Sequence, residues 1–124
     1  MFTDPELARV GLNEAEATRR GIEYRLLAMP MAAVLRTRTL SETPGFMKML
    51  VAAETDEILG FTVFGVEASE LIAAVQTAMV GQVPFTALGR AIYVHPTIAE
   101  GLTFLLRNPP TAPEHQREGS RPYA

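Results

Sequence analysis

The spacing of apolar residues predicts the strands of this protein. In residues 22–26 apolar and polar side chains alternate, which predicts a strand with one buried and one solvent-exposed face, ending before Pro30. Two continuous apolar runs follow at residues 45–53 and 58–65, joined by the polar link 54–57. Apolar runs of strand length on either side of a short polar link predict a β-hairpin, and we expect both of its strands to be central in a sheet.

A helical period begins after Gly65. Apolar residues recur there at helical spacing until Gly81, which we expect to end the helix. Four small side chains in this helix would let another backbone approach closely, although an alanine-rich face more often packs in a core. They are Ala68, Ala73, Ala74 and Ala78.

Capping signals and apolar spacing predict three shorter helices. The first has Asn13 as its N-cap, Glu16 in the capping-box position and Gly21 as its stop. Residues 85–90 are typical of a short helical turn, and residues 97–106 of a final helix. Three residues of the final helix should turn inward: Leu102, Leu105 and Leu106.

The remaining segments have no clear period. Within residues 31–43, residues 32–35 fit one turn of helix, while residues 36–39 alternate arginine with threonine and are expected to be extended. Residues 108–124 are rich in proline and polar side chains, with too little apolar surface to offset the entropy of ordering. We therefore expect one domain, residues 1–107, followed by this segment as a flexible tail.

Composition narrows the classes of function. The chain has 124 residues, 48% of them apolar, and a formal net charge of -3, which is the wrong sign for a nucleic-acid partner. It has neither the roughly 18 consecutive apolar residues of a membrane span nor an exported leader at its start, so a cytoplasmic, soluble protein is expected. Cysteine is absent, so any sulfur chemistry must use sulfur from another chain or domain.

The segment His-Pro-Thr-Ile-Ala-Glu at residues 95–100 is the best candidate for chemistry, since dinucleotide-binding, Walker, nucleophile-elbow and zinc-protease motifs are all missing. With Thr97 as N-cap, Glu100 falls in the first helical turn, and its carboxylate would point back toward His95. A charge-assisted hydrogen bond would favour the imidazolium by about 1.5–3 kcal/mol, against about 0.3–1 kcal/mol from the helix dipole. The ring would then be oriented as a proton acceptor near neutral pH.

Plainer interpretations compete with this one. Thr97 and Glu100 also have the spacing of an ordinary capping box, which from spacing alone is the more frequent case. His95 and His115 are too few for a metal site. Arg36 and Arg38 could bind a phosphate, but the solvated edge of a strand is the simpler interpretation. The six methionines are better explained as core residues than as ligands of a soft metal ion.

Three separated stretches of the chain contain motifs that are informative as an ordered set. The first is Phe-Thr-Asp-Pro-Glu-Leu-Ala-Arg-Val-Gly-Leu at residues 2–12. The second combines Ile-Leu-Gly-Phe at residues 58–61 with the glycine, alanine, glutamate and leucine of residues 65–72, and the third is residues 95–100. In this order they resemble the C-terminal dimerisation domain of the pyridine nucleotide-disulfide oxidoreductases, the family of glutathione reductase, dihydrolipoamide dehydrogenase and mercuric-reductase-like enzymes.

The resemblance implies an α+β fold in which an antiparallel sheet is flanked by helices and the domain forms a homodimer. It also implies that His95 and Glu100 act as an acid-base pair on the redox disulfide of the partner subunit. Because the dinucleotide-binding loops and redox cysteines are absent here, FAD and NAD(P)H would bind to other domains of the parent enzyme. The tail lacks the vicinal cysteines of mercuric reductases, which argues against mercury as the substrate.

Two functions follow as hypotheses. The first is an isolated dimerisation domain that donates this acid-base pair to a flavoenzyme and is itself inactive. The second is a free-standing ligand- or protein-binding module with the same fold, in which His95 and Glu100 form only a structural turn.

Overall fold

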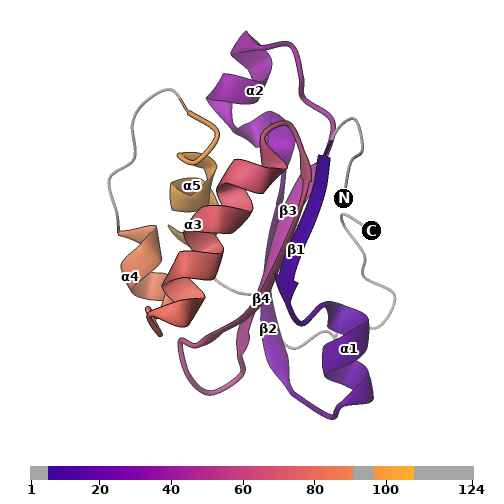
Figure 1. The fold of residues 1–124 in the computed structure, drawn as a ribbon, viewed down its shortest axis with the longest axis vertical. Helices are drawn as coiled ribbons and strands as arrows, with labels where there is room; N and C mark the ends of the chain where they lie inside the picture. Colours follow the sequence, from indigo (N-terminus) through magenta and orange to yellow (C-terminus); the bar gives the residue numbers. More distant parts are fainter. Residues whose placement is uncertain (1–5, 91–96, 108–124) are drawn as a thin grey trace.

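The structure is a computed structural model that describes residues 6–90 and 97–107. In chain order its elements are β1 (Glu6–Gly11), α1 (Glu14–Arg19), β2 (Tyr24–Pro30), the 3-10 helix η1 (Met31–Ala33), α2 (Leu35–Thr39), β3 (Phe46–Ala52), β4 (Ile58–Gly65), α3 (Ala68–Val80), α4 (Phe85–Gly89) and α5 (Gly101–Arg107). The strands form one antiparallel sheet in the order β1-β4-β3-β2, with α3 running along it and α4 and α5 on the same side (Figure 1). The α+β prediction is confirmed.

The predicted hairpin is β3 and β4, and both strands are central, as expected. Edge strand β2 starts at Tyr24 and includes Pro30, whereas the prediction ended it before that proline. The other edge strand, β1, was not predicted from the apolar pattern. It has a short, weak alternation in which only Ala8 and Val10 contact the main core, so its place beside β4 comes from pairing rather than from its own pattern.

One face of the sheet is covered by the main core, and part of the other face by a smaller buried cluster. The larger core lies between the sheet and the helices α3 and α5, and includes Met49, Phe61, Leu71 and Leu102. A smaller cluster on the opposite face joins Ala17 of α1 to Tyr24, Leu26 and Leu50. The predicted alternation is present at the start of β2, where Tyr24 and Leu26 are buried against α1 while Glu23 is exposed and Arg25 is half-buried. Further along the strand, Leu27 and Met29 bury the other face in the main core, which the prediction did not include.

The N-terminal cap predicted for α1 is confirmed. The side chain of Asn13 accepts a hydrogen bond from the backbone N–H of Glu16 at 2.8 Å. The Glu16 carboxylate forms an ion pair with Arg9 of β1 at 3.2 Å, which ties the helix to the edge strand. Gly21, just beyond the helix, has a φ of 69°, a left-handed conformation that glycine adopts without steric cost.

Residues 36–39 are helical, so the extended conformation predicted for them was wrong, as was the interpretation of Arg36 and Arg38 as a strand edge. The physical reason is the burial of Thr37, which is fully inaccessible to solvent. Its hydroxyl hydrogen-bonds the carbonyl oxygens of Met31 at 2.9 Å and Val34 at 2.8 Å. These bonds satisfy a polar group inside the core and close the chain into a turn.

Helix α3 ends at Val80, immediately before Gly81, as predicted, and α4 matches the predicted turn. The four alanines of α3 differ in burial. Ala68 and Ala78 are buried in the core, Ala74 is half-buried and Ala73 is exposed. Four of the methionines are core residues, as expected: Met29, Met31, Met47 and Met49. The predicted flexible tail and residues 91–96 lie outside the described residues.

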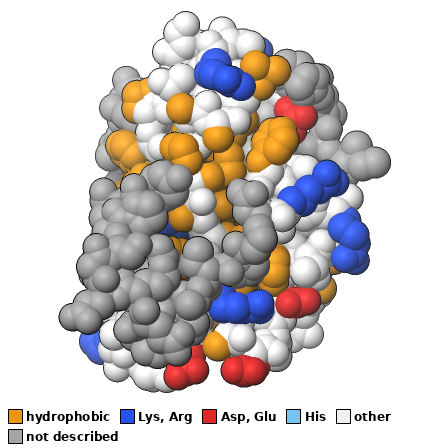
Figure 2. Space-filling view, turned by 180° about the vertical axis from the view of Figure 1, so that it is seen from behind, with side chains coloured by type: hydrophobic (Ala, Val, Ile, Leu, Met, Phe, Trp, Pro, Cys, Tyr) orange, Lys and Arg blue, Asp and Glu red, His pale blue; other side chains and the backbone are white. Residues whose placement is uncertain are grey.

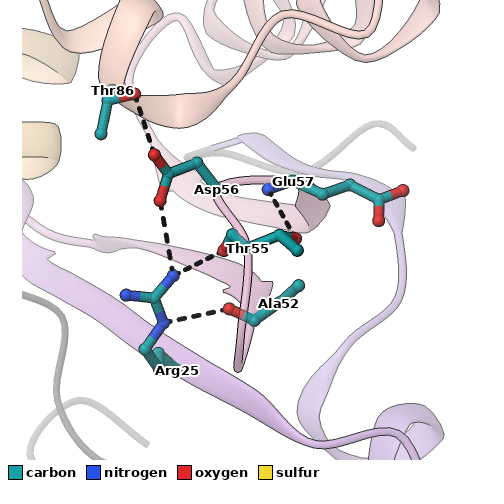
Figure 3. Close-up of polar contacts among 6 residues, drawn as sticks. All are labelled: Arg25, Ala52, Thr55, Asp56, Glu57 and Thr86. Atoms are coloured by element: carbon teal, nitrogen blue, oxygen red, sulfur yellow. Dashed lines mark hydrogen bonds and ion pairs between the residues drawn. The ribbon is translucent and has the colours of Figure 1, made fainter.

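One arginine clamps the tip of the hairpin (Figure 3). Arg25 of β2 donates from Nε to the carbonyl oxygen of Ala52 at 3.0 Å and from Nη2 to that of Thr55 at 2.6 Å. The same guanidinium lies 3.7 Å from the carboxylate of Asp56, which accepts a hydrogen bond from Thr86 of α4 at 3.3 Å. The clamp therefore joins β2, the hairpin turn and α4.

Replacing Arg25 with lysine should lower the free energy of unfolding by about 1–2 kcal/mol, because a lysine cannot bond two carbonyl oxygens in the fixed geometry of a guanidinium. Urea unfolding followed by circular dichroism measures this. Arg20→Lys, at an exposed position after α1, is the matched control and should change stability little. Equal effects of the two substitutions would contradict the clamp.

Candidate acid-base site at the start of α5

The turn that carries Glu100 precedes α5. The hydroxyl of Thr97 accepts a hydrogen bond from the N–H of Glu100 at 3.2 Å, which confirms the predicted N-cap contact. The next N–H groups bond carbonyls three residues back, from Gly101 to Ile98 at 2.9 Å and from Leu102 to Ala99 at 3.0 Å. This tighter turn is why the α-helix starts at Gly101 and not at the predicted residue 97.

Apolar side chains anchor the turn and α5. Ile98 is buried within the turn. The three leucines predicted to face inward do so, with Leu102 and Leu105 fully buried and Leu106 nearly so. Leu106 packs against Gly89 of α4 so closely that an added Cβ on the glycine would lie 2.8 Å from the leucine Cβ. The helix that follows the glutamate is therefore rigidly seated.

Glu100 itself is half-buried, and its backbone C=O accepts a hydrogen bond from the N–H of Thr103 at 3.0 Å. A hollow of about 280 Å³ lies beside the turn, lined by Thr97 and Ile98 together with Arg36 of α2. Glu67 and Glu70, at the start of α3, also line it. His95 lies outside the described residues, so its pairing with Glu100 stays a prediction.

A larger hollow of about 880 Å³ runs along β1 and reaches Phe46 and Lys48 of β3. The Lys48 ammonium forms an ion pair with Glu14 at 3.0 Å and lies 5.4 Å from the centre of the Phe46 ring. The Phe64 ring lies beside that of Phe46, with 6.1 Å between centroids. From behind, hydrophobic side chains are interspersed with basic ones (Figure 2).

The described part of the chain contains neither a cluster of metal-ligating side chains nor a membrane-spanning helix. Within residues 6–90 and 97–107, histidine, cysteine, aspartate and glutamate side chains form no group of three that could hold a metal ion. The helices in these same ranges include none that is both long and apolar enough to cross a bilayer.

The fold and the turn before α5 define a class of protein. Residues 1–105 match the family model described as the pyridine nucleotide-disulphide oxidoreductase dimerisation domain, and the chain belongs to this family. Among curated relatives it is 39% identical over 100 residues to dihydrolipoamide dehydrogenase of Chaetomium thermophilum, covering 81% of this chain and 20% of that protein. It is 32% identical over 105 residues to the probable pyridine nucleotide-disulfide oxidoreductase RclA of Escherichia coli, covering 85% and 24%.

Solved structures agree with this assignment. The flavoprotein disulfide reductase RclA from Escherichia coli superposes with a TM-score of 0.79 at 32% identity, over 83% of this chain and 24% of that one. LpdA from Mycobacterium tuberculosis gives 0.79 at 25% identity, over 86% and 23%. The chain thus spans about a fifth to a quarter of the length of the relatives it matches.

The sequence interpretation singled out Thr97 and Glu100 but not the residues that pack beside their turn. Gly101 is buried against Val34, and neither was considered. A signal was available, since a glycine inside a predicted helix is unfavourable and often marks a close packing contact. Val34 lies 67 positions away from Gly101 in the sequence, and nothing in the sequence around it indicated this contact.

Proposed function

We propose that this domain joins two copies of a flavin-dependent disulfide oxidoreductase and supplies His95 and Glu100 as an acid-base pair to the redox disulfide of the partner subunit. The observation that carries the proposal is the turn of residues 97–100, closed by the Thr97 hydroxyl and anchored by a buried isoleucine. It holds the glutamate backbone in a fixed place in a domain of this family.

The chemistry requires a base. Thiol-disulfide exchange proceeds through a thiolate, so the proton of the attacking thiol must be removed and one must be returned to the leaving sulfur. A histidine steered by a carboxylate can do both near neutral pH. The sequence of this chain contains no cysteine, so the sulfur atoms would come from the other subunit and the substrate.

FAD and NAD(P)H would belong to the remaining part of such an enzyme. This sequence has no glycine-rich dinucleotide loop that could hold either cofactor. When bound in the parent, the cofactors would supply the electrons that reduce the redox disulfide. The residues of this domain would then move protons and hold the two subunits together.

The outward face of α3 is the surface we propose for the contact between copies. Across Ala68–Val80 the only charged residue is Glu70, near the N-terminal end. The exposed positions that follow are uncharged, and Val80 is 83% exposed. A long helix with so little charge facing outward, in a domain of a dimerising family, fits a surface covered by a second copy.

The acid-base pairing is tested by titration of the His95 ring, followed by NMR, in a chain where His115→Gln removes the other histidine. Glu100→Gln should lower the titration midpoint of His95 by roughly 0.5–1 pH unit, because the neutral amide stabilises the imidazolium less than the carboxylate does. Glu57→Gln, in the distant hairpin turn, is the control and should leave the midpoint unchanged. An unchanged titration midpoint of His95 in the Glu100→Gln variant would refute the pairing of His95 with Glu100.

A further inference from the structure

Gly101, the first residue of α5, occupies a place where a side chain would clash with its neighbours. It is buried, and a Cβ added to it would lie 2.7 Å from Cγ2 of Val34 and 3.0 Å from Cε of Met47. Neither distance is an ordinary van der Waals contact. The start of α5 thus lies directly on the wall formed by Val34 and β3.

The two neighbours differ in how easily they could yield. The Met47 atom is the end of a flexible side chain and can move aside. Val34 cannot, because a β-branched side chain has few rotamers and this one is fully buried. Its backbone is also tied: its N–H donates to Met31 at 2.9 Å, and its carbonyl accepts from the N–H of Thr37 at 3.0 Å and from the hydroxyl at 2.8 Å.

Any side chain at residue 101 would therefore displace the start of α5 rather than Val34. Gly101 directly follows Glu100, and its N–H closes the turn by donating to Ile98. A shift there moves the glutamate and strains the bond from its N–H to Thr97. A change in the contact between Gly101 and Val34 should therefore also move the turn that carries Glu100.

We propose that Gly101 and Val34 are positioning residues for Glu100: their contact sets the place of the turn from which the glutamate reaches the histidine. This inference rests on the proposed acid-base function. It explains why a residue with poor helix propensity begins α5, since only glycine brings the backbone this close to Val34.

The test compares Gly101→Ala with Gly81→Ala in the chain that carries His115→Gln. Gly81 also lies at a helix end, has a φ of -82° and would place its Cβ no closer than 3.6 Å to any neighbour. Two quantities are measured: the titration midpoint of His95 and the hydrogen-exchange rate of the Glu100 amide. Gly101→Ala should shift the midpoint in the same direction as Glu100→Gln, by at least half as much, and accelerate exchange, while Gly81→Ala changes neither.

A rescue separates positioning from general loss of stability. In Gly101→Ala/Val34→Ala the truncated wall makes room for the new methyl, so both quantities should return toward those of the parent chain. The charged groups around the neighbouring hollow, Arg36, Glu67 and Glu70, are the same in all these chains. If Gly101→Ala fails to fold, Val34→Ala alone loosens the same contact and should shift the midpoint in the same direction.

The outcomes are distinguishable. An effect of Glu100→Gln on the midpoint without any effect of Gly101→Ala on midpoint or exchange would overturn the positioning role alone. No effect of Glu100→Gln would refute the acid-base pair, and the amide exchange of Glu100 would still decide whether Gly101 places the turn. Failure of the double variant to restore either quantity would contradict the role of Val34.

Discussion

Replacing Gly60 with alanine is expected to lower the free energy of unfolding by at least about 3 kcal/mol, a large part of the 5–15 kcal/mol typical of a domain. A Cβ at this position would lie 1.9 Å from the carbonyl oxygen of Leu12 and 2.6 Å from its nitrogen. These are backbone atoms that cannot rotate away. The N–H of Leu12 also bonds the carbonyl of Leu59 at 3.0 Å, so relief of the clash would break the end of the β1–β4 ladder.

Urea unfolding followed by circular dichroism measures the Gly60 effect, with Gly81→Ala as the control because that glycine has room for a methyl group. The control should stay within about 1 kcal/mol of the parent chain. A Gly60 variant as stable as the control would show that β1 can separate from β4 at little cost, and that the observed register is not required for the fold.

The second large effect is expected at the outward face of α3. Ala73→Arg should weaken self-association by about 100-fold or more, because a twofold interface would place two like charges in it at once. Arginine has a high helix propensity, so the exposed position should accept it without loss of the helix. Sedimentation equilibrium over a range of concentrations measures the change in dimer dissociation constant.

Ala33→Arg is the matched control, since it makes the same exchange at an exposed position in η1, outside the proposed surface on α3. It should leave the dissociation constant unchanged. Equal weakening by both variants would point to a general effect of added charge. If the unsubstituted domain is monomeric at every concentration, the proposed dimer surface is refuted for the isolated domain.

The sequence predicted those parts of the fold whose signal is local. The continuous apolar runs of β3 and β4, the helical period of α3 and the cap of Asn13 on α1 were all confirmed, because each depends on residues close together in the chain. For the candidate site, local spacing was enough to predict the Thr97 hydroxyl bond to the Glu100 amide. The pairing of that glutamate with His95 remains a prediction.

Burial in the core and pairing between strands decided the rest. Residues 36–39 alternate like a strand, yet they are helical because Thr37 buries its hydroxyl against two carbonyls in the core. Strand β1 has too weak a pattern to be recognised alone and is defined by its pairing with β4. The two faces of β2 are buried by different parts of the fold, one by α1 and the other by the main core, which includes Leu27 and Met29.

The sequence by itself thus determined the order and type of most elements, the family and the residues of the candidate acid-base pair, since apolar period, capping and motif are all readable within a few positions. Only the tertiary structure decided which backbones approach one another closely. Gly60 against Leu12 and Gly101 against Val34 join segments that are far apart along the chain. A glycine carries no side chain to indicate its neighbour, so the contact that we propose positions the Glu100 turn appears only once the chain has folded.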